Sequence, residues 1–465
     1  MTASSTLGRP TTAGRGRRGT VPPVPWLPLL AFLVVAVAVW LVVWWSAGHL
    51  PRHPQYYPSP VPGGGGPLFE GWARWDGFWY RTIAEEGYVY YPGVQSSVAF
   101  FPGYPLVMRA VSVAVPNLFV AGSLTTFVAG LLAIRWLWAW LTARMSVRAA
   151  GVTLGVVLLY PFSWYLFGAV YADALFLAAA IGAFVAVDRD RIWTAGLLGF
   201  VASASRPTGV AVAVGLVLVT LEKRNAARRV VAGAVDATAA AVRPEPVAAG
   251  AVEGVPGRSH GAIDHADASA VAPASSGVAG RARRAARALG ERFDPRGFRR
   301  EDAPLLLAFG GLVAYMAYLW VRFGHPLLFS EIQGVKGWDQ PAGWTTWLKV
   351  PVLHKLTTDP FSDAGVMMVV QAALTAVALA LVPRVARRFG WGYAAYVLAV
   401  VAIPVLGSKD FVGLGRYLLP AFPCFAVVGE GLARRPAGVR VGAYLMLGTG
   451  LLAMASFFAR GYYLS

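Results

Sequence analysis

Long apolar runs without charged residues constrain this chain more than any other feature of its sequence. The first run, Trp26 to Gly48, contains no charged residue, and at ~1.5 Å per helical residue it is longer than a hydrocarbon core of about 30 Å. Ten more apolar runs follow, at about 117–141, 149–167, 170–187, 192–204, 207–221, 304–321, 365–383, 391–406, 416–433 and 438–458. We therefore expect an all-α polytopic membrane protein with a bundle of about eleven transmembrane helices.

The composition agrees with a chain that lies mostly in lipid. Hydrophobic residues make up 57% of the 465 residues and charged residues 14%, whereas soluble proteins carry about 25% charged residues. The net charge of +18 fits nucleic acid, an anionic membrane surface, or unequal charge on two membrane faces. Cys424 is the single cysteine, which excludes an intrachain disulfide and a cysteine-based metal framework.

The orientation follows from the basic residues and from a break within 192–221. Arginines precede the first run, which predicts a cytoplasmic N-terminus. Pro207 removes a hydrogen-bond donor and restricts the residue before it, so we expect two short helices that meet at the outer face with Arg206 at their junction. One long helix would instead place the arginine-rich segment 222–302 outside. Most of the positive charge then lies on the cytoplasmic side and records orientation, and we expect no nucleic-acid partner.

Four regions are expected along the chain. They are a disordered basic cytoplasmic tail (1–25), an N-terminal membrane module (26–221) with the outer loop 49–116, a disordered low-complexity cytoplasmic loop (222–302), and a C-terminal membrane module (303–465) with the outer loop 322–364. Arg281 to Arg300 holds eight arginines. This stretch is either a contact for anionic lipids at the cytoplasmic face or a topology signal.

The first outer loop contains the most distinctive polar pattern. Trp75, Trp79 and Ile83 recur at every fourth position, which predicts an apolar stripe on a short helix lying along the membrane interface. Asp76 stands at the start of this helix. It is either an N-cap residue or a functional carboxylate, and the two roles are compatible.

An aromatic and proline-rich turn follows in the same loop. Phe101 and Tyr104 lie in the sequence Ala99 to Pro105, in which two prolines force an extended or turning backbone. Leu106 to Val115 is amphipathic around Arg109. We expect this segment to re-enter the membrane surface, either as a floor for an isoprenoid chain or as an interfacial packing element.

Ionisable residues at the ends of the apolar runs are further candidates, because charged groups near membrane depth are costly. The alternative is that long side chains extend to the interface from helix ends. The residues are Asp173, Arg206, Arg322, Lys409 and Arg416. The six histidines show no metal-ligand spacing, and neither a P-loop nor a GxSxG sequence occurs. No cofactor is evident, and chemistry would depend on carboxylates, cations and a lipid-facing groove.

Two motifs of the first outer loop resemble a known family. Trp75-Asp76-x-x-Trp79-Tyr80-x-x-Ile83-Ala84-x-x-Gly87-Tyr88, followed by Ala99-Phe100-Phe101-Pro102-x-Tyr104-Pro105, is similar to the PIG-V-like mannosyltransferases of the GT-C superfamily. Ser205-Arg206-x-x-Gly209, Phe323-Gly324-x-Pro326 and the sequence Gly415 to Pro423 also resemble motifs of that family.

This resemblance implies a GT-C-like bundle in the plasma membrane that transfers mannose from a polyprenyl-phosphate donor to an extracytoplasmic acceptor. It implies that Asp76 is the general base. An inverting transfer needs one base and cations for the leaving phosphate, for which Arg206, Arg416, Lys409 and Arg322 are candidates. The substrate groove is expected at Trp75, Trp79, Tyr80, Phe101, Tyr104, Asp173 and Tyr417. A monophosphate leaving group reduces the need for a divalent metal, and a dependence on metal stays open.

The acceptor stays open between a lipid-linked glycan, a lipoglycan and a protein, and the sugar between mannose and a pentose. Two other functions fit the same cationic groove. The chain could be a transporter or flippase of lipid-linked glycans, although no internal repeat supports transport. It could also be a non-enzymatic subunit that docks an envelope complex through the Trp75–Asp76 loop. The long first outer loop favours the enzyme.

Overall fold

The computed structural model describes residues 26–54, 61, 63–242, 278–340, 343–359 and 361–464. These residues form α-helices and short 3₁₀ helices, and no strand occurs among them. The chain divides into two compact units. The first comprises Met1–Leu216 with Ala303–Ser465, and the second comprises Val217–Asp302.

Five helical segments are long and apolar enough to cross a bilayer by length and composition. They are α1 (Leu27–His49), α5 (Leu118–Thr142), the Arg300–Phe323 segment, α15 (Asp363–Phe389) and α19 (Ala437–Ala459). The third segment consists of the 3₁₀ helix η4 (Arg300–Phe309) and α11 (Gly310–Phe323). Val34 and Leu41 on α1 are 62% and 58% exposed in the protein, and lipid is the solvent that suits such side chains. By these features the chain is a multi-pass membrane protein.

Shorter helices complete the first unit. They are α6 (Val147–Leu159), α7 (Asp173–Asp188), α8 (Ile192–Ser205), α16 (Trp391–Gly407) and α18 (Phe422–Ala433). α7 packs between α5 and α8 and is buried over nearly its whole length. Its many alanines and Gly182 let neighbouring helices approach closely, because a Cβ on Gly182 would lie 2.7 Å from the Trp136 ring.

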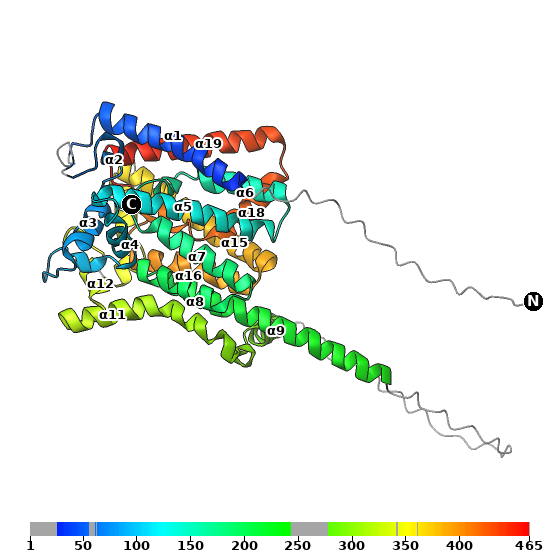
Figure 1. The fold of residues 1–465 in the computed structure, drawn as a ribbon. Coiled ribbons are helices and arrows are strands. Elements are labelled where there is room, and N and C mark those ends of the chain that lie inside the picture. The colour runs from blue at the N-terminus through cyan, green and yellow to red at the C-terminus, as the bar shows by residue number, and fades with distance from the viewer. Residues whose placement is uncertain are drawn as a thin grey trace, which may run out of the picture. The chain divides into compact units, whose positions relative to one another are not determined.

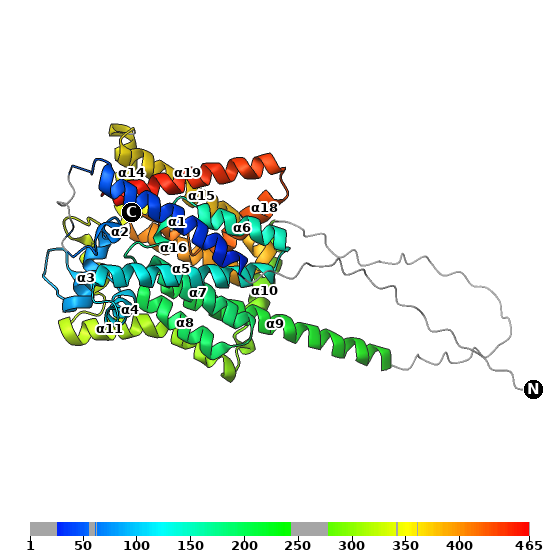
Figure 2. The same ribbon diagram turned by 45° about the horizontal axis from the view of Figure 1, so that its top comes forward.

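The remaining contacts close the bundle. α6 packs against α18, α15 against α16, and α8 against α11. The first and last helices, α1 and α19, lie side by side (Figures 1 and 2). The N-terminal and C-terminal membrane segments therefore form one packed body.

One end of the bundle carries short elements from two long connections. The segment 49–116 contains α2 (Pro67–Glu70), α3 (Asp76–Glu86), η1 (Ser97–Ala99) and α4 (Gly103–Ser112). The segment 322–364 contains α12 (Leu328–Glu331), η5 (Ile332–Gly334), α13 (Trp344–Trp347) and α14 (Val350–Thr358). We call this the α3 end; the turns between α5 and α6 and between α18 and α19 lie at the other end (Figure 1).

The expected break in 192–221 is present at Arg206, but of the two helices only the first is short, since the second has 34 residues. α8 ends at Ser205, Arg206 takes an extended conformation, and α9 (Gly209–Val242) begins three residues later. Glycine is required at the start of α9, since a Cβ there would lie 2.3 Å from the Ser203 Cα.

Two expected spans are shorter than the sequence indicated. The run 149–167 yields α6, which ends at Leu159 before Pro161, and then the 3₁₀ helix η2 (Ser163–Leu166). The run 416–433 yields α17 (Leu414–Tyr417) and α18, which are separated at Pro420. In both cases proline lacks the amide hydrogen that would continue the helix.

The expectation of disorder over 222–302 differs from the structure at both ends of that segment. α9 extends to Val242, and α10 (Val278–Arg292) and η3 (Pro295–Gly297) follow, because runs of alanine and arginine favour helix by their intrinsic propensity. Residues 243–277 and the tail 1–25 lie outside the described residues. Within the second unit the Asn225 amide donates to the carbonyls of Arg292 and Asp294 at 3.0 and 2.9 Å, and Arg224 pairs with Asp302 at 2.9 Å.

Candidate active site

The start of α3 is held by the end of α19. The Arg74 guanidinium is fully buried, and its Nε and Nη2 donate to the Ala459 carbonyl at 3.0 and 2.7 Å. The Trp75 indole donates to the Tyr462 carbonyl at 3.2 Å. Between these anchors Trp75 has φ of 48°, a conformation that is strained for a bulky residue and that occurs often at functional sites.

The helix therefore begins at Asp76, and Trp75 occupies the N-cap position without a side-chain capping bond. This corrects the expectation that Asp76 caps the helix. The stripe of Trp75, Trp79 and Ile83 also differs from expectation, because it packs on the protein and not on a lipid surface. Ile83 is buried, and the Trp79 ring stacks on Phe100 with centroids 5.8 Å apart.

The Asp76 carboxylate belongs to an alternating row of acids and arginines. Arg416 of α17 places its Nη1 at 3.1 Å from Asp76 Oδ2 and at 3.9 Å from Asp173 Oδ2. Asp173, at the start of α7, accepts a hydrogen bond from Arg206 Nη1 at 2.5 Å. We call these four residues the acid–arginine row. Four elements that are far apart in sequence meet here, and the two acids balance the two arginines.

Burial changes along the acid–arginine row. The side chains of Asp173, Arg206 and Arg416 are 3%, 7% and 9% exposed, while that of Asp76 is 21% exposed. Buried charges must be paired because desolvation is costly, and the pairing of Asp173 with Arg206 meets that need. Asp76 is the member of the row that an outside group can reach most easily.

Aromatic rings surround the two arginines. Tyr417 lies with its ring centroid 4.4 Å from Arg206 Cζ, and Tyr171 lies 5.1 Å from Arg416 Cζ. Such cation–π contacts stabilise desolvated guanidinium groups. The Tyr171 hydroxyl also accepts a hydrogen bond from the Asp76 amide at 3.2 Å. Burial, reinforced by the Asp76 charge, raises the pKa of Tyr80 well above its usual value, so this phenol stays neutral and does not act as a base.

Two buried polar atoms in the row have no hydrogen-bond partner in the described part of the chain. They are Arg416 Nε and Asp173 Oδ2. Buried donors are nearly always satisfied in proteins. Arg416 Nε is therefore a donor that an anionic or carbonyl oxygen of a ligand would satisfy.

The other expected cations do not join this row. Lys409 Nζ lies 3.9 Å from Asp339, and its amide donates to Gln340 Oε1 at 2.5 Å. Arg322 is exposed at the end of α11 and makes no ion pair within the described residues. Among the described residues neither Lys409 nor Arg322 forms an ion pair or hydrogen bond with Asp76 or Arg416, so the structure does not group them with the other two arginines.

Four of the expected groove residues, Phe101, Tyr104, Tyr80 and Asp173, are buried in the protein interior. Phe101 packs in a core with Tyr315 and Phe329. The Tyr104 hydroxyl donates to the Gly122 carbonyl at 2.8 Å, and its side chain is fully buried. Phe101 and Tyr104 position α4, and neither reaches a surface on which a substrate could lie. Tyr80 is buried beside Tyr104, whereas Trp75, Trp79 and Tyr417 are half-buried.

Three residues that support the row were not identified from the sequence. They are Arg74, Tyr171 and Gln371. Gln371 is a fully buried amide in the apolar helix α15, and its Oε1 accepts a hydrogen bond from the Gly415 amide at 2.7 Å. This bond holds α17 beside the row. A lone amide in an apolar run was the available signal, since such groups need a specific partner.

Within the described residues no three His, Cys, Asp or Glu side chains come together as a metal site would require. No known protein family matches the chain, and no curated protein matches it in sequence. Among solved structures the chain is similar to the archaeal oligosaccharyltransferase AglB from Archaeoglobus fulgidus in complex with an inhibitory peptide and a dolichol-phosphate. The identity is 14% and the TM-score 0.40, and the match covers 94% of this chain and 56% of that one. We assign no family from this likeness.

Proposed function

We propose that this protein is a membrane glycosyltransferase of the GT-C type. The sugar that it transfers is mannose, which passes from a polyprenyl-phosphate donor to an acceptor at the α3 end, with Asp76 as general base. The observation that carries the proposal is the acid–arginine row, in which the partly exposed Asp76 carboxylate pairs with the buried Arg416 and a buried Asp173–Arg206 pair adjoins it. The row joins three motifs that are widely separated in sequence, Trp75-Asp76, Ser205-Arg206 and Gly415-Arg416.

The chemistry needs few groups from the protein. Asp76 takes the proton of the acceptor hydroxyl while that oxygen attacks the anomeric carbon of the donor sugar. The bond from this carbon to the phosphate oxygen breaks, and the lipid phosphate leaves with the electron pair. The configuration at the anomeric carbon inverts, and no covalent sugar–enzyme intermediate forms. Because the leaving group is already an anion, it needs cationic stabilisation and no general acid.

Arg416 is the residue best suited to stabilise the leaving phosphate. Its Nε is an unused buried donor, and its Nη1 is shared with Asp76. A donor phosphate on this guanidinium would bond Nε and compete with Asp76 for Nη1, which frees the carboxylate for the acceptor hydroxyl. Arg206 stays paired with Asp173, and this pair adjoins Arg416 through Asp173 Oδ2.

The membrane supplies the donor in this proposal. The plasma membrane is the expected location, with the α3 end and the C-terminus extracytoplasmic and the N-terminus cytoplasmic. The opposite end carries Arg144, Arg388 and Arg434 at the α5–α6 turn and at the ends of α15 and α18, which agrees with the preference of cytoplasmic loops for basic residues. The acceptor is a lipid-linked glycan, a lipoglycan or a protein.

The test is sugar transfer by Asp76→Asn in isolated membranes, with labelled polyprenyl-phosphate mannose as donor and analysis of labelled lipid and protein products. We expect transfer to fall by at least about a hundredfold, which is the usual effect of losing a general base. Asp339→Asn is the matched control, since Asp339 is an exposed carboxylate in the 322–364 segment, and it should transfer at the wild-type rate. Transfer by Asp76→Asn at the control rate would refute the assignment of the base.

A further inference from the structure

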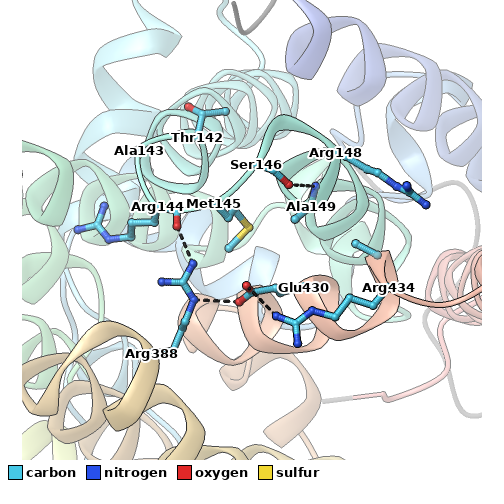
Figure 3. A pocket seen from close by; sticks show the side chains of 11 residues that line it. Thr142, Ala143, Arg144, Met145, Ser146, Arg148, Ala149, Arg388, Glu430 and Arg434 are labelled. Carbon is cyan, nitrogen blue, oxygen red and sulfur yellow. Dashed lines mark hydrogen bonds and ion pairs between the residues drawn. The ribbon is translucent and has the colours of Figure 1, made fainter. Parts of the chain in front are cut away.

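A second charged site lies at the end of the bundle opposite the acid–arginine row. A hollow of about 770 Å³ opens there between the α5–α6 turn, the end of α15 and the end of α18. Its lining contains four arginines and a single acid, which are Arg144, Arg148, Arg388, Arg434 and Glu430. We call it the basic hollow (Figure 3).

Part of its charge has a structural role. Arg388 Nη2 donates to the Arg144 carbonyl at 2.6 Å and so caps the end of α5. The Arg144 guanidinium bonds Asp188 at 2.6 Å and stacks on Trp140 at 4.4 Å. These two arginines are explained by helix-end bonding and packing.

The remaining charge is not balanced within the hollow. Glu430 bonds both Arg388 at 3.0 Å and Arg434 at 3.2 Å, so a single carboxylate serves two arginines. Arg148 is exposed and makes none of the interactions marked in Figure 3. Four arginines thus face two acids, Glu430 and Asp188, and two positive charges are left over at the rim.

The floor of the basic hollow is apolar. Met145, Ala149 and Ala433 line it, and they belong to a hydrophobic cluster with Val152 and Tyr444. Beyond this cluster α19 exposes the apolar side chains of Val441, Leu445 and Met446. A basic rim above an apolar floor suits an amphipathic molecule with an anionic group at one end and an apolar chain at the other.

We propose that the basic hollow binds the phosphate headgroup of an anionic membrane phospholipid, with the acyl chains lying along the apolar surface next to α19. The phosphate oxygens accept from Arg148 and Arg434 at the rim. Basic hollows between membrane helices bind such headgroups in other proteins. This site is separate from the acid–arginine row, and the proposal does not depend on the proposed transfer reaction.

The test compares two double variants of the full-length protein. Arg148→Gln with Arg434→Gln removes the two rim charges. Arg189→Gln with Arg435→Gln is the control, because both of these arginines are exposed and neither lines the hollow. Each protein is purified in detergent with an equimolar mixture of phosphatidylglycerol and phosphatidylcholine, and the retained lipid is measured by native mass spectrometry.

We expect wild type and control to retain phosphatidylglycerol in preference to phosphatidylcholine, and the rim variant to retain at least about tenfold less of it. Equal retention by rim variant and control overturns the proposal. Elution volume on gel filtration checks the fold, and Arg148→Gln alone replaces the double variant if its elution changes. Displacement of the lipid by millimolar inorganic phosphate assigns the hollow to a free phosphate ion and overturns the choice of a lipid.

Discussion

The two ends of this bundle use the same residue types in opposite ways. At the α3 end the acid–arginine row sets two acids against two arginines, and three of the four side chains are less than 10% exposed. At the other end the basic hollow sets four arginines against Glu430, and Arg434 is 76% exposed. One site is neutral and desolvated, and the other is positive and open.

The difference shows that exposure to solvent determines how strongly an arginine side chain interacts with other charged groups. Inside the bundle a guanidinium must be paired, and each hydrogen bond it makes is strong because the surroundings screen charge poorly. Such a group suits the stabilisation of charge that develops during a reaction. At an open surface, water and salt weaken each pair. Surplus arginines there act through their summed potential, which suits reversible attraction of an anion.

The largest difference between the two ends is expected when one ion pair is broken at each of them. Asp173→Asn leaves Arg206 buried without its carboxylate, and we expect a loss of about 3–5 kcal/mol in the free energy of unfolding. Asp188→Asn breaks the more exposed pair with Arg144 and should cost about 0–1 kcal/mol. Denaturant unfolding in detergent, followed by tryptophan fluorescence, measures both. Similar losses for the two variants would show that burial does not distinguish these pairs.

A smaller effect is expected when arginine is replaced by lysine at each end. Arg416→Lys keeps the charge but removes Nε and the planar fork. The transfer rate from polyprenyl-phosphate mannose should fall by about tenfold or more, as when one donor to a developing anion is lost.

Arg388→Lys is the control for this change, and its transfer rate should stay within about twofold of wild type, because the basic hollow takes no part in the reaction. The measurement is kcat and donor KM in membranes. A decrease of the same size in both variants would mean that the Arg416 effect is structural. An unchanged rate in Arg416→Lys would remove Arg416 from the phosphate site.

The smallest effect is expected from neutralising the acid of the basic hollow. Glu430→Gln frees Arg388 and Arg434, so retention of phosphatidylglycerol should rise about threefold or more, while the free energy of unfolding changes by less than about 1 kcal/mol. Native mass spectrometry and denaturant unfolding measure the two quantities. Lower retention in this variant would indicate that Glu430 orients the arginines and does not merely neutralise them.

Local features of the sequence were predictable because they depend on nearby residues. The junction of α8 and α9 at Arg206 follows from Pro207 and Gly209. The long apolar helices follow from the absence of charge over a span length. The helical ends of 222–302 were missed because the expectation required an apolar face, whereas alanine-rich segments form helix by propensity.

Which aromatic side chains lie in the protein interior was not predictable. The sequence Ala99 to Pro105 indicates a turn that re-enters the membrane surface, as a floor for an isoprenoid chain or as an interfacial packing element. Tyr104 is instead fully buried, and its hydroxyl donates to the Gly122 carbonyl. The period of the Trp75, Trp79 and Ile83 stripe was correct for a helix. The stripe packs against Phe100 and the C-terminal segment. These partners lie outside α3, so the periodicity of α3 could not predict them.

The sequence by itself therefore determined the membrane class of the protein and the break at Arg206, and it indicated Asp76 and Arg416 as candidate site residues. Only the tertiary structure decided which charges meet. Asp76 and Arg416 are 340 residues apart, and Arg74 and Ala459 are 385 apart. Hydropathy and helix signals act over a few turns, whereas the pairing of buried charges depends on the packing of helices from both ends of the chain. The same packing separates the neutral row at the α3 end from the positive hollow at the other.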